Sequence, residues 1–120
     1  MINELIKDIH KKNVEAGWWN DPISGKSLLN DPYVVGTKLL LVVSEISEAT
    51  EGFRKGLNDD KLPHRSMIEV ELADAVIRIF DLCGALNLDL EGAIKEKRVF
   101  NGVRADHKLE NRAKEGGKKF

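Results

Sequence analysis

Four carboxylates in this chain are spaced so that they could act together on one cation. Glu45 and Glu48 lie three residues apart, and so do Glu71 and Asp74. Residues three apart share one face of an α-helix, with Cβ atoms about 5–6 Å apart, so each pair can direct both carboxylates to one point. Carboxylates held close together repel one another, and ligation by oxygen alone suits Mg²⁺ or Mn²⁺. The two pairs therefore predict a metal-dependent catalytic site, with Mg²⁺ the expected ion and Mn²⁺ possible.

A plainer interpretation is that these carboxylates are solvated surface charges that share this spacing by chance. Glu51 extends the first series and leaves its exact pair open, whereas Glu69 fits a helix-capping role better. A di-iron site is not supported, because it needs Glu-x-x-His pairs and none is present. Cys83 falls on an apolar helical stripe and is expected in the core. The chain also has no Gly-rich phosphate loop of the P-loop type.

Cationic and amide side chains could hold an anionic substrate beside such a metal. Lys97, Asn101 and Arg104 are spaced by four and three residues, so they share one helical face. A Lys, an amide and an Arg on one face can bind phosphate oxygens or a sugar hydroxyl. Lys38, seven residues before Glu45, is a weaker candidate for substrate binding. A solvated polar face is the alternative interpretation.

Two adjacent tryptophans, Trp18 and Trp19, follow the first helix in a turn-rich loop. Adjacent side chains in such a loop do not easily both enter the core. One is expected to pack and the other to offer a stacking face for a nucleotide base. His10, on the preceding helix, could reach the same pocket. Lys118 and Lys119, near the end of the sequence, could close over a bound anion, although a disordered end explains them equally well.

The elements that must position these residues are helices, because apolar residues recur at intervals of three and four and no alternating strand pattern is present. The first is expected at residues 2–16, before Gly17. The second runs from Pro32, with Asp31 as N-cap, to about Lys55. Ser66 and Glu69 predict a capping box for the third helix. The fourth begins after Asp89 and runs to about Arg104.

Two apolar patterns indicate how these helices pack. The third helix carries a nearly complete apolar face that is expected to form the core: Ile68, Leu72, Ala75, Val76, Ile79, Cys83 and Leu86. Between Val34 and Val43, by contrast, apolar residues of the second helix fall on nearly every side. A helix that is apolar all round is buried all round. Four short helices cannot cover it within one subunit, so we expect a homodimer or homotetramer.

Composition fits one all-α domain. The chain has 120 residues, of which 42% are hydrophobic and 32% charged, and its formal net charge is −1. We expect one domain spanning residues 1–120, with a helical core at 2–104 and a polar tail at 105–120. The near-zero charge argues against a nucleic-acid polymer or an anionic membrane as the main partner. A single cysteine and no signal-like segment favour a cytoplasmic location.

Taken in order, the motifs resemble a known family. The chain reads EISE at residues 45–48, ELAD at 71–74 and KRVFNGVR at 97–104. This sequence resembles the MazG-like all-α nucleoside triphosphate pyrophosphohydrolases, whose signature is Glu-x-x-Glu, a spacer, Glu-x-x-Asp and a downstream Lys-x-x-x-Asn-x-x-Arg. The resemblance covers about residues 33–107. It implies a four- to five-helix bundle that dimerises, sometimes into tetramers, with active sites near the subunit interface.

The resemblance also implies roles for the candidate residues. By position, Glu45, Glu48, Glu71 and Asp74 would bind Mg²⁺, and the downstream Lys, Asn and Arg would contact phosphates or sugar. The implied reaction is hydrolysis of a nucleoside triphosphate between its α and β phosphates, releasing monophosphate and pyrophosphate. The base and sugar preference is left open. Two other classes also remain open: a non-catalytic helical dimer that binds nucleotides or a protein partner, and a metal-buffering or structural bundle.

Overall fold

The computed structural model describes residues 1–120 and is helical throughout, with five α-helices, one short 3₁₀ helix and no strand. The only strand-like pairings are two isolated bridges, Asn20 with Ser27 and Asn58 with Ser66. The prediction of an all-α chain is therefore confirmed. The chain divides into two compact units, Met1–Leu88 and Asp89–Phe120. None of the helices combines the length and apolar character that a membrane span requires.

The first unit contains three helices whose ends match the caps expected from the sequence: α1 (Ile2–Glu15), α2 (Pro32–Lys55) and α3 (Met67–Ala85). The Asp31 side chain accepts hydrogen bonds from the first turn of α2. Gly56 ends α2 in the left-handed region, at φ 62°, which a glycine adopts without steric cost. Ser66 and Glu69 form the reciprocal capping box of α3. Local capping thus fixes where each helix begins and ends.

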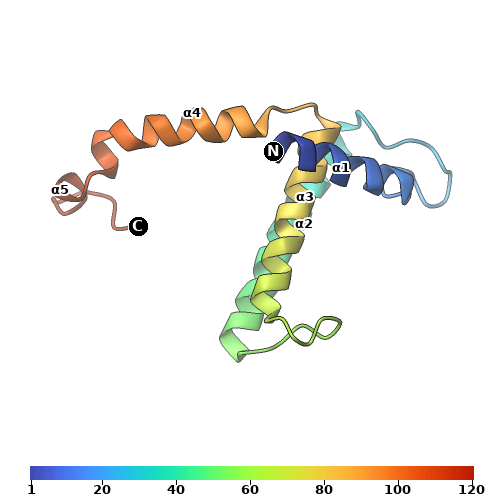
Figure 1. Ribbon diagram of the computed structural model, residues 1–120, viewed down its shortest axis with the longest axis horizontal. Coiled ribbons are helices and arrows are strands. Elements are labelled where there is room, and N and C mark those ends of the chain that lie inside the picture. The colour runs from blue at the N-terminus through green and yellow to red at the C-terminus, as the bar shows by residue number, and fades with distance from the viewer. The chain divides into compact units, whose positions relative to one another are not determined.

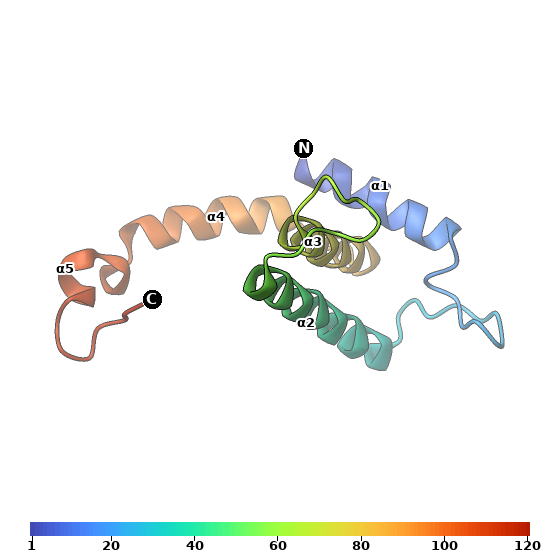
Figure 2. The same ribbon diagram turned by 90° about the horizontal axis from the view of Figure 1, so that it is seen from below.

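Helices α2 and α3 pack side by side as a hairpin (Figures 1 and 2), and small and acidic residues are buried on both. The buried residues of α2 are Glu45, Ala49 and Gly52. Gly52 lies so close to α3 that an added Cβ would stand 2.7 Å from the Cβ of Met67. Ala75, at 2% exposure, is the corresponding small residue of α3. Small side chains therefore let the two helices approach closely enough for carboxylates of both to meet.

Helix α1 and the loop after it pack on the C-terminal part of α3. Ile6 is the buried residue of α1. Gly84 of α3 lies against His10, and an added Cβ there would stand 2.5 Å from the His10 Cβ. Trp19, at 2% exposure, is the most completely buried large side chain of the chain. Its indole joins the loop to α3 by donating to Asp81.

The apolar faces of α2 and α3 are only partly covered in this chain, which corrects the expectation of a complete core face on the third helix. Ala75 and Cys83 are buried. Ile68 is half-buried, but four other large apolar members of that face are exposed: Leu72, Val76, Ile79 and Leu86. Helix α2 exposes a matching stripe made of Leu39, Val43, Ile46 and Phe53. The reason is geometric, since α2 turns its acidic face toward α3 and its apolar stripe away.

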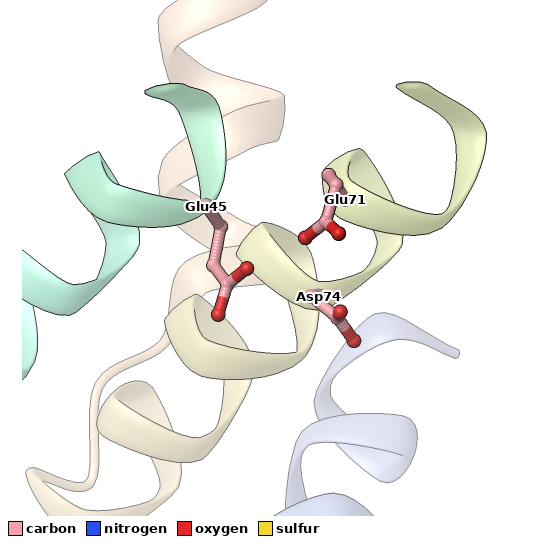
Figure 3. Close-up of side chains that lie close together, drawn as sticks. All are labelled: Glu45, Glu71 and Asp74. Atoms are coloured by element: carbon pink, nitrogen blue, oxygen red, sulfur yellow. The ribbon is translucent and has the colours of Figure 1, made fainter. Parts of the chain in front are cut away.

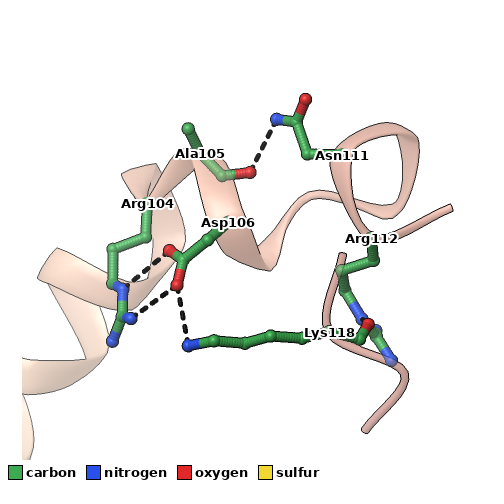
Figure 4. A network of polar contacts seen from close by, with 6 residues as sticks. All are labelled: Arg104, Ala105, Asp106, Asn111, Arg112 and Lys118. Carbon is green, nitrogen blue, oxygen red and sulfur yellow. Dashed lines mark hydrogen bonds and ion pairs between the residues drawn. The ribbon is translucent and has the colours of Figure 1, made fainter. Parts of the chain in front are cut away.

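The second unit consists of α4 (Leu90–Val103), the 3₁₀ helix η1 (Ala105–His107) and α5 (Leu109–Arg112). The Asp89 side chain caps α4 by accepting from Gly92 N. Arg104, expected at the end of the fourth helix, is its C-cap and has an extended backbone. The segment expected as a polar tail contains η1 and α5. An ion-pair network around Asp106 links Arg104 to Lys118 (Figure 4).

The close α2–α3 contact predicts opposite effects for two glycine substitutions in α2. Gly52→Ala should destabilise the protein by about 1–2 kcal/mol, because the overpacking cost exceeds the gain in helix propensity. Gly36→Ala is the matched control, since nothing lies within 4 Å of its added Cβ; it should be neutral or stabilising by up to about 1 kcal/mol. Urea unfolding at one fixed protein concentration measures both. Equal stabilities for the two variants would contradict the close approach.

Candidate metal centre

Three carboxylates meet where α2 and α3 face each other. Glu45 reaches across from α2 toward α3, which carries Glu71 and Asp74 (Figure 3). One oxygen of each residue lies within 4.8 Å of the others. Glu45 and Glu71 are both 8% exposed, and Asp74 is half-buried. The structure thus brings together three of the four carboxylates that the sequence proposes as ligands.

Burial and mutual repulsion perturb this group strongly. Burial, together with the neighbouring carboxyl groups of Glu45 and Glu48, raises the pKa of Glu71 to about 8. The pKa of Asp74 is also raised, first by burial and then by the charge of Glu45. Burial pushes the pKa of Glu45 upward too, but a hydrogen bond from Arg78 and other neighbours outweigh it and lower that pKa. Near neutral pH these shifts favour the protonated form of Glu71 and the charged form of Glu45.

One oxygen of Glu71 lacks any partner. Its Oε2 is fully buried and makes no hydrogen bond. A buried polar atom without a partner costs free energy comparable to its desolvation, so such atoms are rare in folded proteins. A divalent cation would supply the missing partner and relieve the repulsion between the carboxylates. The donor set is all oxygen, which is the chemistry that Mg²⁺ and Mn²⁺ prefer, so these residues fit the expected metal.

Glu48, the fourth expected ligand, lies at the edge of this group. It is exposed and outside the set of mutually close oxygens. It is nevertheless near enough for its charge to raise the pKa of Glu71. Glu48 and Glu71 both line a cavity of about 480 Å³, whose wall also contains Asp59 and Asp60. This second acidic wall extends the negative charge of the centre toward the α2–α3 loop.

A larger cavity of about 530 Å³ also borders the centre. Glu45 and Asp74 form part of its wall, and three cationic side chains line it as well: Lys38, Lys61 and Arg78. The exposed indole of Trp18 adds an aromatic surface to the same cavity. A cavity with carboxylates at one side, cations around it and an aromatic ring matches the chemical groups of a metal-bound nucleotide.

The two tryptophans divide as their adjacency predicts, one packed and one exposed. Trp19 is buried and donates Nε1–H to both Asp81 oxygens, at 3.0 and 3.1 Å. Lys38 lies over its ring, with Nζ 4.1 Å from the ring centroid, and burial lowers the pKa of that lysine. Trp18 is 68% exposed. Only Trp18 offers a free ring face, because Trp19 is buried and its ring is covered by Lys38 and His10.

His10 packs against the same buried indole. Its Nδ1 lies 2.8 Å from Asp81 Oδ1, and its ring meets the Trp19 ring edge-on at 5.6 Å. Asp81 therefore holds α1 and the tryptophan loop against α3. His10 contributes to packing and orientation through this pair.

The expected phosphate-binding residues of the fourth helix lie in the second unit. The charged ends of Lys97 and Arg104 both stack on Phe100. Arg104 is engaged by Asp106, with Nε–Oδ1 at 3.0 Å and Nη2–Oδ2 at 2.7 Å. Asn101 has a buried Oδ1 without a hydrogen-bond partner. Arg104 would have to give up this pair before its whole guanidinium could bind a phosphate.

The two tail lysines also make contacts within the second unit. Lys118 Nζ lies 2.8 Å from Asp106 Oδ2 (Figure 4). The backbone carbonyls of Lys118 and Lys119 accept hydrogen bonds from Arg112. The tail thus folds back on α5 through a network in which Asp106 is the shared acceptor.

Comparison of the chain with protein-family models, curated proteins and solved structures finds no match. Sequence reasoning missed several residues of this site, chiefly Lys61, Arg78 and Asp81. For two, a signal was available: Arg78 lies four residues after Asp74, and Asp81 seven after it, so both share its helical face. Lys61 lies in a loop, where spacing carries no such information.

The raised pKa of Glu71 predicts how stability depends on pH when a chelator removes divalent cations. Glu71 has a pKa of about 8 in the folded chain against an ordinary value of 4.5. Folding therefore takes up a proton between these values, and stability should fall as pH rises from about 5 to 8. Glu71→Gln should flatten this decline, because the amide does not titrate.

Urea unfolding at several pH values measures this effect. Glu4→Gln, at an exposed position of α1, is the control and should keep the wild-type profile. A Glu71→Gln profile parallel to that of the wild type would contradict the protonated state of Glu71.

Proposed function

We propose that this chain is a Mg²⁺-dependent nucleoside triphosphate pyrophosphohydrolase of the MazG-like all-α type. It would cleave an NTP or dNTP between the α and β phosphates, yielding a monophosphate and pyrophosphate. One observation carries the proposal: a buried Glu71 oxygen without a partner lies among clustered carboxylates. The cavity beside this cluster supplies the cationic and aromatic groups that a nucleotide needs. The order of the sequence motifs resembles that of the MazG-like family, and this resemblance is the reason for proposing cleavage between the α and β phosphates.

Residue roles follow from position and chemistry. Glu45, Glu71 and Asp74 would hold the cation, with Glu48 contributing from the edge of the cluster. When bound, the ion would supply Lewis-acid stabilisation of the phosphate oxygens. Lys38 and Lys61 line the cavity and would neutralise charge on the phosphates. By the resemblance, Lys97, Asn101 and Arg104 are proposed as further contacts to phosphate or sugar.

The exposed apolar stripes of α2 and α3 support an oligomer as the working form. Leu39, Val43 and Ile46 are exposed on α2, and Val76 and Ile79 on α3. Stripes at helical spacing on a two-helix hairpin suit packing against the same hairpin of a second copy. A homodimer, or a homotetramer built from dimers, would bury them. We propose this assembly as part of the function, since the family it resembles places its active sites near such an interface.

The reaction is tested most simply with a panel of ribo- and deoxynucleoside triphosphates in Mg²⁺. The expected products are pyrophosphate and the monophosphate, with no free phosphate. Glu45→Gln, Glu71→Gln and Asp74→Asn should each reduce kcat by about a hundredfold or more while the far-ultraviolet circular dichroism stays unchanged.

Glu51→Gln is the matched control, because Glu51 pairs with Arg54 and Lys55 on the exposed side of α2; it should retain activity. Binding of nucleotides without turnover would favour the non-catalytic binding module instead.

Base stacking by Trp18 is a separate prediction. Trp18→Ala should raise KM by about five- to a hundredfold, since base–aromatic stacking is worth about 1–3 kcal/mol. Trp18→Phe should recover most of the loss, because it keeps an aromatic face. Steady-state kinetics with the best substrate of the panel measures the effect. Unchanged KM values in Trp18→Ala for every base would assign the loop a structural role only.

The proposed assembly is tested at Val43, which is 57% exposed in the single chain. Val43→Lys should shift the protein toward monomer, because an unpaired charge buried in an apolar interface costs several kcal/mol. Light scattering after size exclusion at micromolar concentration gives the mass. Ala16→Lys, at an exposed position after α1, is the control and should leave the mass unchanged. A wild-type protein that is monomeric under these conditions would refute the assembly.

A further inference from the structure

Arg78 is a cation in direct contact with a proposed cation ligand. Its Nε lies 2.8 Å from Glu45 Oε1. The Arg78 side chain is 41% exposed, whereas that of Glu45 is 11% exposed. One partner of this pair is therefore fixed in the helix seam, and the other reaches it from the open cavity.

The pair and a divalent cation would use the same carboxylate. An oxygen that already accepts a charge-assisted hydrogen bond is a weaker metal ligand, and a guanidinium repels a nearby divalent cation. The same contact acts to lower the pKa of Glu45, so Arg78 favours the charged form of that carboxylate. Binding of Arg78 and binding of a cation to Glu45 should therefore oppose each other.

The side chain of Arg78 can also occupy the neighbouring cavity. It lines the 530 Å³ cavity together with Lys38, Lys61 and the indole of Trp18. It lies four residues after Asp74 on α3, so its backbone stays beside the centre whatever its side chain does. A guanidinium presents a planar fork of donors that matches two phosphate oxygens. A rotation of the partly exposed side chain would exchange a carboxylate for a phosphate as its partner.

We propose that Arg78 is a displaceable substrate-binding residue: it pairs with Glu45 until a divalent cation takes that carboxylate, and then binds the phosphates of the substrate. The role rests on the proposed function, because it needs both the cation and a polyphosphate. It makes phosphate binding follow cation binding. When a substrate binds without the cation, Arg78 is still paired with Glu45 and cannot bind the phosphates.

The proposed role and a purely structural role of Arg78 predict opposite changes in cation affinity when Arg78 is removed. If Arg78 merely orders Glu45, its removal should weaken cation binding. If Arg78 competes with the cation, its removal should tighten cation binding and weaken polyphosphate binding. The two binding equilibria can be measured separately and without turnover.

The first measurement is calorimetric titration with Mg²⁺ alone, for the wild type, Arg78→Gln and Arg78→Lys. All variants are titrated at one fixed pH, so that competition by protons is comparable between them. Arg78→Gln should bind Mg²⁺ about five- to tenfold more tightly than the wild type, and Arg78→Lys should lie near the wild type. Arg54→Gln is the control for net charge, because Arg54 pairs with exposed Glu51 outside the cavity; its affinity should not change.

The second measurement uses imidodiphosphate, a non-hydrolysable pyrophosphate analogue, at saturating Mg²⁺. Arg78→Gln should bind it about tenfold or more weakly, and Arg78→Lys should recover only part of that loss. Circular dichroism confirms that each variant is folded, and Arg78→Met, which also removes the charge, carries the test if the glutamine variant is not. Equal or weaker Mg²⁺ affinity in Arg78→Gln would overturn the displacement, while leaving the metal centre intact. A wild type that binds no Mg²⁺ would overturn the proposed function itself.

Discussion

The burial of three carboxylates between α2 and α3 is the constraint on which the rest of this structure depends. Glu45 and Glu71 are buried in this seam, and Asp74 lies half-buried beside them. Like charges in such a place repel and shift one another's pKa, and a helix seam chosen for stability alone would bury apolar groups instead. Arg78 neutralises only Glu45, so the remaining two stay unbalanced unless they are protonated or bind a cation. This unbalanced charge is the reason to expect a bound cation at the three carboxylates.

The same constraint explains the small residues and the exposed apolar stripes. Carboxylates of two helices meet only if the backbones are close, and Ala49, Gly52 and Ala75 allow that approach. Turning the acidic face of α2 inward necessarily turns Leu39, Ile46 and Phe53 outward. A chain arranged in this way places its chemistry in the seam within one hairpin, and it leaves its largest apolar surface for contact with another molecule.

Sequence reasoning predicted the helices and the spacing of the carboxylates, because both depend on local rules. Caps such as Asp31 and Ser66 define helix ends within a few residues, and residues three apart share a face wherever the helix packs. It did not predict that Leu72, Val76 and Ile79 of α3 would be exposed in the single chain, since periodicity defines faces without saying what covers them. It also overlooked Arg78, whose importance depends on a carboxylate 33 positions earlier in the chain. The division between Trp18 and Trp19 was expected, but which of them is buried depends on Asp81.

Anomalous scattering from a crystal grown or soaked with Mn²⁺ tests the central claim most directly, because it locates the cation without reference to catalysis. We expect a peak between α2 and α3, about 2.1–2.2 Å from carboxylate oxygens of Glu45, Glu71 and Asp74. The Glu71 oxygen that lacks a partner should be among the ligands. A map without a peak at this position, in a crystal whose bulk Mn²⁺ is at millimolar concentration, would contradict the assignment of these three residues as a metal centre.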